Sequence, residues 1–506
     1  MARSTRPSPG PAASPGPEPS PPLPAPPSAA PRDRGLYCNR TLNLRSVRAI
    51  GYDMDYTLIH YRVDAWEGRA YAHVQQMLRS RGWPVDHLAF DPDAVIRGLI
   101  IDRELGNVVK ANRHGYVNQA AHGTRMLDFD TQRRTYADTL VDLSDPRWSF
   151  LNTLFSLSET TLYAQLVDLL DDGALPHGIG YAELHDVVRR SIDAAHVEGA
   201  LKAEVIADPD RFVELDPDTP LALLDQRAAG KRLLLVTNSE WHYTRAMMAY
   251  AFDRFLPAGT TWRDVFDIAI VAARKPAFFR ERMPLFEVVD DTGLLRPVGT
   301  DLGRNRVFLG GNAGLIEAAL GVSGGDILYV GDHMFGDVHA PKGIQRWRTA
   351  LVLRELEADL AAEAAFAPRQ AELSALMDVK TRLELDYSQA RLDLTRTQAT
   401  PPYGPSSGTP PEALQARMAA LRAELVALDE RIAPLAIAAG QLNNPRWGLV
   451  MRSGNDKSYL AHQIERHADM YLSRVSNFLF ETPYVYLRAR RGSLPHDRPG
   501  VAPPLG

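Results

Sequence analysis

Two aspartates stand one residue apart in the stretch GYDMDYT, residues 51–57. The apolar run at residues 47–52 predicts a buried strand, which puts Asp53 and Asp55 at its carboxyl end. Two like charges this close are costly unless a positive charge lies between them. A hard divalent cation is the usual solution, because carboxylate oxygens suit Mg²⁺. A D-x-D sequence alone is more often a solvated turn, so a catalytic interpretation needs partners elsewhere in the chain.

Three more apolar runs of strand length are each followed by polar residues. Helical segments separate these runs along the chain, which is the pattern of a doubly wound parallel sheet in an α/β protein. Ligands of such sheets bind beyond the carboxyl ends of the strands, so we expect the four clusters to meet at one edge. The runs and the polar residues after them are residues 231–236 with Thr237, Asn238 and Ser239; residues 266–271 with Lys275; and residues 326–330 with Asp332 and Asp337.

Taken together, the four clusters resemble the haloacid dehalogenase (HAD) superfamily, in which D-x-D-x-T, a strand-end threonine, a lysine and G-D-x-x-x-G-D occur in this order. Within it, the chain is similar to the cytosolic purine 5′-nucleotidases that prefer IMP and GMP. The similarity covers roughly residues 35–490. It is carried by GYDMDYTL, TNS, ARKP-FF, LYVGDHMFGD and WRT-LV, with LNTLF at residues 151–155 and RSG at residues 452–454.

The resemblance implies a magnesium-dependent phosphoryl transfer. Asp53 is expected to attack phosphorus and form an aspartyl-phosphate. Asp55 is expected to protonate the leaving ribose oxygen and then to activate water. Mg²⁺ would be held by Asp53, the backbone carbonyl of Asp55 and Asp332, with Asp337 supporting the water ligands of the metal.

The remaining strand-end residues are expected to bind the phosphoryl group. Thr237, Asn238 and Ser239 would contact its oxygens, and Lys275 would neutralise charge on the nucleophile and on the transferred group. A nucleoside hydroxyl can open the same phosphoenzyme in place of water, so the resemblance implies phosphotransferase activity beside hydrolysis.

Between Thr57 and Thr237 the chain is far longer than a crossover between two strands requires. The resemblance assigns residues 61–224 to a cap domain that selects the leaving group. The catalytic core is then formed by residues 34–60 and 225–353. The sequence pattern predicts cap helices at residues 71–81, 152–170 and 183–207, and a hairpin at residues 108–116.

One stripe of a predicted cap helix carries Arg189, Asp193 and His196, which are spaced i, i+4 and i+7. From the residues alone, an exposed Arg–Asp pair is the plainer interpretation. The resemblance instead places all three at the edge of the purine base.

The resemblance also implies a stacking ring for the base, Phe155, with Lys202 nearby. The sequence departs from the family at Ser156, where better-known members carry an amide, and at Val197, where they carry a tyrosine. These two differences leave the base preference open.

The composition after Arg354 shifts to Ala, Leu, Glu and Arg, and predicts a helical hairpin over residues 354–440. A less regular helix is expected at residues 370–394, and a Pro-, Gly- and Ser-rich link at residues 400–411. Residues 441–490 are expected to be helical, with one helix over residues 458–480, and to pack on the core. The second arm of the hairpin has a heptad seam formed by Leu414, Met418, Leu421, Leu425, Leu428, Ile432 and Leu435.

The resemblance also suggests a site for a nucleotide effector. Phe335 would stack on the effector, with Lys342, Gln463 and Arg466 beside it. His467 replaces an expected tyrosine there.

The chain has 506 residues, enough for two or three domains, and a formal net charge of −5 that gives no hint of nucleic-acid binding. Its single cysteine, Cys38, cannot form an internal disulfide, which fits a reducing compartment such as the cytoplasm. No apolar stretch is long enough for a membrane span. A homo-oligomer, dimer or tetramer, is expected.

The ends of the chain, residues 1–33 and 491–506, are expected to be disordered tails. The first of them is rich in Pro, Ala and Ser. A ligand for an SH3-like partner and an organelle transit peptide are the alternatives for this first tail.

Two other functions compete with a purine 5′-nucleotidase. One is a HAD phosphatase for a different phosphomonoester, such as a sugar phosphate. The other is a catalytically idle HAD scaffold that binds partners through its hairpin and its Pro-rich tail.

Overall fold

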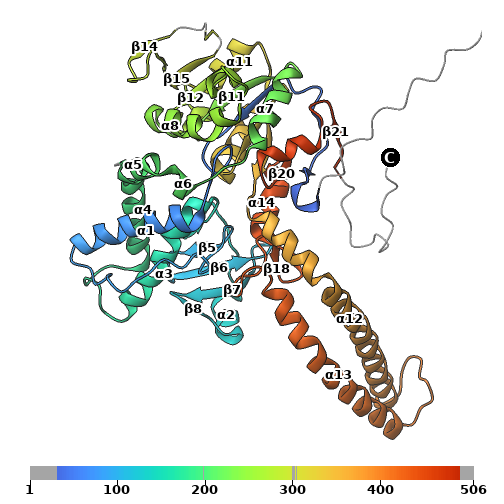
Figure 1. The fold of residues 1–506 in the computed structure, drawn as a ribbon. Helices are drawn as coiled ribbons and strands as arrows, with labels where there is room; N and C mark the ends of the chain where they lie inside the picture. Colours follow the sequence, from blue (N-terminus) through green and yellow to red (C-terminus); the bar gives the residue numbers. More distant parts are fainter. Residues whose placement is uncertain (1–30, 198, 299–301, 304, 490–506) are drawn as a thin grey trace, which may run out of the picture.

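The computed structural model describes residues 31–197, 199–298, 302–303 and 305–489, without the side chains of Arg32, His196 and Val197. Most of the two predicted tails, residues 1–30 and 490–506, therefore lies outside the described part. The described chain has a core, an inserted segment between Tyr61 and Val213, and a long projecting hairpin (Figure 1).

A ten-stranded sheet forms the core, and its middle strand is β3 (Ala49–Tyr52). Parallel partners lie on both sides of β3: β11 (Arg232–Val236) on one and β16 (Ile327–Gly331) on the other. The strand order therefore reverses at β3, which confirms the predicted α/β class with a doubly wound parallel sheet. Outside this trio lie β12 (Ile268–Val271), β15 (Arg306–Gly310), β17 (Arg348–Val352) and β20 (Met470–Leu472), then the antiparallel strands β1 (Tyr37–Cys38), β13 (Leu285–Val288) and β14 (Leu295–Pro297).

The central strands are apolar because both faces of the sheet are covered. In β11, Leu233 and Leu235 pack into one hydrophobic cluster, whereas Leu234 and Val236 pack into another. This alternation follows from the two-residue period of a strand, and it explains why the run is continuously apolar. The core helices are α7 (Asp218–Ala228), α8 (Trp241–Phe252), α9 (Trp262–Val265), α10 (Ala277–Arg280) and α11 (Ala313–Leu320).

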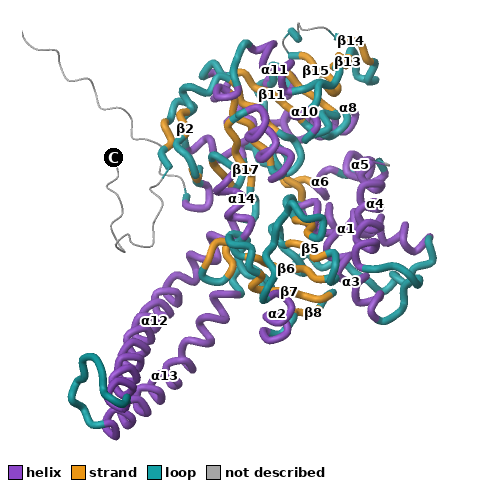
Figure 2. Tube along the Cα trace, turned by 180° about the vertical axis from the view of Figure 1, so that it is seen from behind, coloured by secondary structure: helices purple, strands orange, loops and turns teal. Residues whose placement is uncertain are grey.

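The inserted segment leaves and rejoins the core through two short strands that pair with each other, β4 (His60–Tyr61) and β10 (Val213–Glu214). Inside the segment, a five-stranded antiparallel sheet packs beside a group of helices (Figures 1 and 2). The elements of the segment are α1 (Val63–Ser80), β5 (Ile100–Asp102), β6 (Asn107–Ala111), β7 (Val117–His122), β8 (Arg125–Met126), α2 (Phe129–Tyr136), β9 (Trp148–Phe150), α3 (Leu157–Asp171), α4 (Tyr181–Val197), α5 (Ala200–Ala207) and α6 (Pro209–Phe212).

Two predicted helices differ in the structure. The expected helix at residues 183–207 is two helices, α4 and α5, because Gly199 has a left-handed φ of 77° that a continuous helix cannot contain. The expected helix at residues 458–480 ends early, as α14 (Tyr459–His467), and is followed by β20 and a 3₁₀ turn at Val475–Phe480. Strand β20 pairs with β17, so residues 441–490 are not helical throughout but contribute a strand to the main sheet.

The hairpin consists of α12 (Leu356–Gln398) and α13 (Pro411–Gly440), which lie side by side and project away from the rest of the protein (Figures 1 and 2). Five residues of the heptad seam are buried: Leu414, Leu421, Leu428, Ile432 and Leu435. Among the described residues, no helix has both the length and the apolar character of a membrane span.

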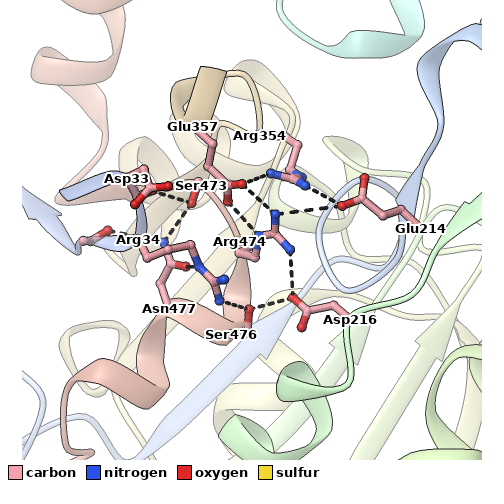
Figure 3. A network of polar contacts seen from close by, with 11 residues as sticks. Asp33, Arg34, Glu214, Asp216, Arg354, Glu357, Ser473, Arg474, Ser476 and Asn477 are labelled. Carbon is pink, nitrogen blue, oxygen red and sulfur yellow. Dashed lines mark hydrogen bonds and ion pairs between the residues drawn. The ribbon is translucent and has the colours of Figure 1, made fainter. Parts of the chain in front are cut away.

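A polar network connects the base of the hairpin to the inserted segment (Figure 3). Arg474 donates two hydrogen bonds to Glu357 in the first turn of α12, at 2.7 and 2.6 Å. The same guanidinium lies 3.8 Å from Asp216, just after β10. The network therefore fixes the second connection of the inserted segment against the C-terminal part of the core.

Further minor elements are 3₁₀ turns at Arg32–Arg34, Leu154–Ser156, Asp253–Phe255 and Gly324–Asp326 and a π-helical turn at Pro341–Gln345. Short strands are β2 (Leu42–Asn43), β18 (Arg452–Ser453), β19 (Asp456–Lys457) and β21 (Tyr486–Leu487).

Candidate active site

Three buried carboxylates meet where β3 and β16 end. Asp53 follows β3, and its backbone N–H donates a 2.9 Å hydrogen bond to Val330 of β16. Asp332 and Asp337 follow β16, and one oxygen from each of the three aspartates lies within 4.8 Å of the others. All three side chains are buried. This is the meeting of strand-end acids that the sequence pattern predicts.

Lys275 supplies a positive charge to this cluster. Its Nζ lies 2.8 Å from Oδ1 of Asp53 and 2.7 Å from Oδ1 of Asp337, and it also donates to the hydroxyl of Tyr329 at 3.1 Å. The lysine side chain is only 3% exposed. Tyr329 donates in turn to the carbonyl of Val236, so the lysine is anchored to the sheet.

Asn238 holds the backbone of Lys275 rather than pointing freely into the site. Its Oδ1 accepts a 2.6 Å hydrogen bond from the N–H of Lys275, and its Nδ2 donates to the carbonyl of Lys275 at 3.2 Å. The Thr237 hydroxyl is buried and accepts from the N–H of Ser239 at 3.0 Å. In the structure, these two side chains therefore shape the loops around the lysine.

The cluster has fewer positive charges than negative ones. Burial raises the pKa of Asp53 well above its usual value, and the nearby Asp337, Asp332 and Asp55 add to this, while Lys275 opposes it. Burial also raises the pKa of Asp332 to about 7. Burial acts to lower the pKa of Lys275, but Asp337 and Asp53 hold it well above its usual value. Hard oxygen donors with an excess of negative charge fit a divalent cation such as Mg²⁺.

Asp55 is half-buried and accepts hydrogen bonds from two hydroxyl groups. The Tyr61 hydroxyl donates to Oδ1 at 2.5 Å, and the Ser239 hydroxyl donates to Oδ2 at 2.6 Å. Lys202 comes close to the same group, because its Nζ lies 3.5 Å from Oγ of Ser239. Ser239, predicted on the phosphoryl oxygens, is thus bonded to Asp55.

The inserted segment contributes two residues that the sequence analysis did not assign to the site. The Thr153 hydroxyl donates to Oδ2 of Asp332 at 2.7 Å. The fully buried Arg97 guanidinium donates to the main-chain carbonyls of Asp332 and Val352. Thr153 lies within the LNTLF stretch that carries the resemblance, so the sequence contained a signal that it belongs to the site. Arg97 has no such signal in the sequence, because its partners are distant along the chain.

Phe155 and Arg189, which are predicted to bind the base, contact other side chains of the protein. Phe155 is half-buried, with its ring edge-on to Tyr56 at 4.6 Å between centroids and to Trp66 at 5.7 Å. Arg189 donates to the buried Glu159 at 3.0 Å and lies 3.7 Å from Asp193. The side chain of His196 is outside the described part of the structure.

Burial and nearby positive charges act on His333, which follows Asp332 in the chain. The pKa of His333, next to Asp332, is lowered to about 4, chiefly by burial and in part by the charges of Lys275, Arg97 and Arg189, while Asp337 opposes the shift.

The predicted effector residues surround a π-helical turn at Met334–His339. Phe335 is 41% exposed and stacks on His339 with centroids 5.4 Å apart, and the guanidinium carbon of Arg280 lies 5.0 Å from the Phe335 ring centroid. Burial and the charges of Arg280 and Arg466 lower the pKa of His339. Gln463 shares α14 with Arg466.

Lys342, also predicted to contact an effector, is occupied within the protein. Its Nζ lies 2.6 Å from both carboxylate oxygens of Asp469. An effector anion would therefore have to compete with Asp469 for this lysine.

Comparison with known proteins assigns the chain to a family. The model of the 5′ nucleotidase family matches residues 36–499, so the chain belongs to that family. A 5′-nucleotidase domain-containing protein of Dictyostelium discoideum is 24% identical over 485 residues, which is 93% of this chain and 76% of the relative. The 5′-nucleotidase domain-containing protein 2 of Homo sapiens is 25% identical over 482 residues, 92% of this chain and 85% of the relative. Its counterpart in Rattus norvegicus is also 25% identical over 482 residues, 92% of this chain and 80% of the relative. Membership of this family supports nucleotide hydrolysis, in general terms, as the activity of the chain.

Proposed function

We propose that the chain is a magnesium-dependent 5′-nucleotidase of the HAD type that hydrolyses purine nucleoside 5′-monophosphates such as IMP and GMP. The observation that carries the proposal is the contact of Lys275 with Asp53, 2.8 Å apart, inside a buried group of three carboxylates. A nucleophilic carboxylate beside a fixed cation is what phosphoryl transfer through an aspartyl-phosphate requires.

The chain's own residues divide the reaction into two steps. An oxygen of Asp53 attacks phosphorus while the bond from phosphorus to the ribose 5′-oxygen breaks, and Asp55 gives its proton to that oxygen. Water then attacks the phosphorus of the aspartyl-phosphate and gives a proton to Asp55, which frees Asp53 and orthophosphate. A nucleoside hydroxyl in place of water gives phosphotransferase activity.

The metal fits the residues present, because Asp53, Asp332 and the backbone carbonyl of Asp55 are oxygen donors, with Asp337 beside them. When bound, Mg²⁺ would neutralise charge on the phosphoryl oxygens. Lys275 contributes a fixed positive charge beside Asp53, and Asp337 keeps that lysine charged and in place.

Base selection is assigned to the inserted segment. Phe155 offers an aromatic face or edge to the base, Arg189, Asp193 and His196 offer polar groups, and Lys202 approaches from α5. The site around Phe335, Arg466 and Gln463 is proposed for a nucleotide effector, with Lys342 available only if Asp469 releases it. We further propose a cytoplasmic enzyme that assembles as a homo-oligomer.

A panel of substrates tests the proposal. Phosphate release should be measured from IMP, GMP, AMP, CMP and a sugar phosphate, each with Mg²⁺ and with a chelator. The expected result is metal-dependent release that is fastest from IMP or GMP. A preference for the sugar phosphate would support the alternative that the chain is a phosphatase for a different phosphomonoester. Absence of phosphate release from every substrate would contradict the proposal that the chain is an enzyme.

A further inference from the structure

We infer that Tyr61 is a positioning residue, which holds the Asp55 carboxyl in the orientation needed to protonate the leaving oxygen. The inference rests on the proposed function, because it assigns a role within that reaction. It is carried by two hydroxyl groups that donate to the Asp55 carboxyl group and by a third that contacts the first of them.

The contacts are short and converge on Asp55. The Tyr61 hydroxyl donates to Oδ1 at 2.5 Å, and the Ser239 hydroxyl donates to Oδ2 at 2.6 Å. The Tyr61 oxygen also lies 2.9 Å from the hydroxyl oxygen of Tyr243. Because Tyr61 uses its proton toward Asp55, its oxygen accepts a hydrogen bond from Tyr243. Tyr243, Tyr61 and Asp55 therefore form one directed chain of hydrogen bonds.

Burial makes this chain hard to replace with water. Tyr61 is 3% exposed and Tyr243 is 2% exposed. Removing the Tyr61 hydroxyl would leave Oδ1 of Asp55 without this donor, and bulk solvent has little access to the gap. The carboxyl group could then rotate away from the leaving oxygen, although the residue itself would still be present.

The position of the Tyr61 hydroxyl is set by the rest of the protein. The Tyr61 ring packs at 4.4 Å from Trp66 and at 5.3 Å from Tyr56, between centroids. Tyr61 belongs to β4, where it pairs with Val213 of β10, so both connections of the inserted segment meet beside Asp55. A proton donor for the leaving group is thereby placed by the same strands that place the inserted segment over the site.

The two parts of the Tyr61 side chain can be separated experimentally. Tyr61→Phe removes the hydroxyl and keeps the ring that packs on Trp66. Tyr56→Phe is the matched control, because its hydroxyl is also buried but has no hydrogen-bond partner among the residues that the structure describes.

The discriminating measurement is kcat/KM for two leaving groups. This ratio reports the steps up to formation of the phosphoenzyme, the step in which Asp55 acts as an acid. A ribose 5′-oxygen needs that proton, whereas p-nitrophenolate leaves without one. General acid catalysis typically contributes 10²- to 10⁴-fold, and a misoriented acid should forfeit part of that.

Tyr61→Phe should therefore lower kcat/KM about 10- to 100-fold for IMP or GMP and less than about 3-fold for p-nitrophenyl phosphate. Tyr56→Phe should leave both values within about 2-fold of the wild type, by the same reasoning. If Tyr61→Phe does not fold, Tyr243→Phe tests the same chain one step further out and should give the same selective loss, smaller in size.

Equal losses on the two substrates, or no loss on either, would overturn the role of Tyr61 while leaving the nucleotidase intact. A wild-type protein that releases phosphate from neither substrate would overturn the proposed function and the inference together.

Discussion

The Thr153 hydroxyl donates a 2.7 Å hydrogen bond to Oδ2 of Asp332, a residue 179 positions later in the chain. Thr153 belongs to the inserted segment and Asp332 to the end of β16 in the core. The inserted segment thus fixes the orientation of a carboxylate proposed to hold the metal. Partners that orient a metal ligand commonly change metal affinity by 10- to 100-fold when they are removed.

We predict that Thr153→Val weakens Mg²⁺ binding about 10-fold, because the side chain keeps its shape and loses its donor. The measurement is the rise in melting temperature with Mg²⁺ concentration, since a ligand of the folded state stabilises it. Thr161→Val is the control, because the Thr161 hydroxyl is buried and has no partner in the described part of the chain. Identical Mg²⁺ midpoints for the two variants would contradict the prediction.

Asp53→Asn should abolish phosphate release and leave the fold intact. Asparagine keeps the shape of the side chain but cannot form the aspartyl-phosphate. It also removes one charge from a crowded group of carboxylates, so the melting temperature should not fall. Phosphate release and thermal unfolding measured on one sample check both statements. Asp64→Asn, exposed on α1, is the control for activity. Wild-type turnover in a well-folded Asp53→Asn protein would contradict the proposed mechanism.

The strand ends of the core could be predicted because each is marked locally. The apolar runs before Asp53, Thr237, Lys275 and Asp332 are continuous, and a parallel sheet brings their carboxyl ends to one edge. This expectation does not depend on knowing which strands pair with each other in the sheet. The α/β class followed from the same alternation of strands and helices.

What could not be predicted depends on distant partners. Residues 470–472 form a strand only because β17 lies beside them, and three residues carry too little periodicity to separate a strand from a helix. The bonds from Arg97 to the carbonyls of Asp332 and Val352 have the same character, because they join residues 235 and 255 positions apart. Arg97 is unremarkable in its own stretch and acquires a role only where the inserted segment meets the core.

Glu67 provides a pH-dependent test of the inserted segment. Burial raises the pKa of Glu67 to about 7, although the Ser158 hydroxyl and N–H donate to its Oε2. Below about pH 4.5 both the folded and the unfolded states hold the proton. Between about pH 4.5 and 7 only the folded state keeps it, so the free energy of unfolding falls as pH rises.

Glu67→Gln should remove this dependence. Urea unfolding of both proteins from pH 4.5 to 8 gives the difference in their free energies of unfolding. That difference should shift by about 3 kcal/mol in favour of the variant across the range, from about 1.4 kcal/mol per pKa unit. Other titrating groups are common to both proteins and cancel. A difference that stays flat with pH would show that Glu67 ionises normally in the folded protein.

Arg474 tests the network at the base of the hairpin (Figure 3). Burial acts to raise the pKa of Glu357, yet the hydrogen bond from Arg474 and the charge of Arg354 lower it to about 2. Arg474→Gln would leave a partly buried carboxylate short of its partner, which should cost about 3 kcal/mol of unfolding free energy. The control is Lys380→Gln, which breaks the exposed pair with Asp429 on the hairpin and should cost less than about 1 kcal/mol. Equal losses in urea unfolding would mean that the network does not stabilise the fold.

Phe155 separates base binding from packing. If its ring contacts the purine, Phe155→Ala should weaken purine monophosphates by about 1–3 kcal/mol, the range for losing a base–aromatic stack. p-Nitrophenyl phosphate has no base and should be nearly indifferent. If the ring only packs against Tyr56 and Trp66, its removal leaves a cavity that costs about 3–5 kcal/mol of stability, and both substrates suffer together. Activities on the two substrates and the melting temperature of this one variant decide between these outcomes, because only base binding gives a selective loss at a preserved melting temperature.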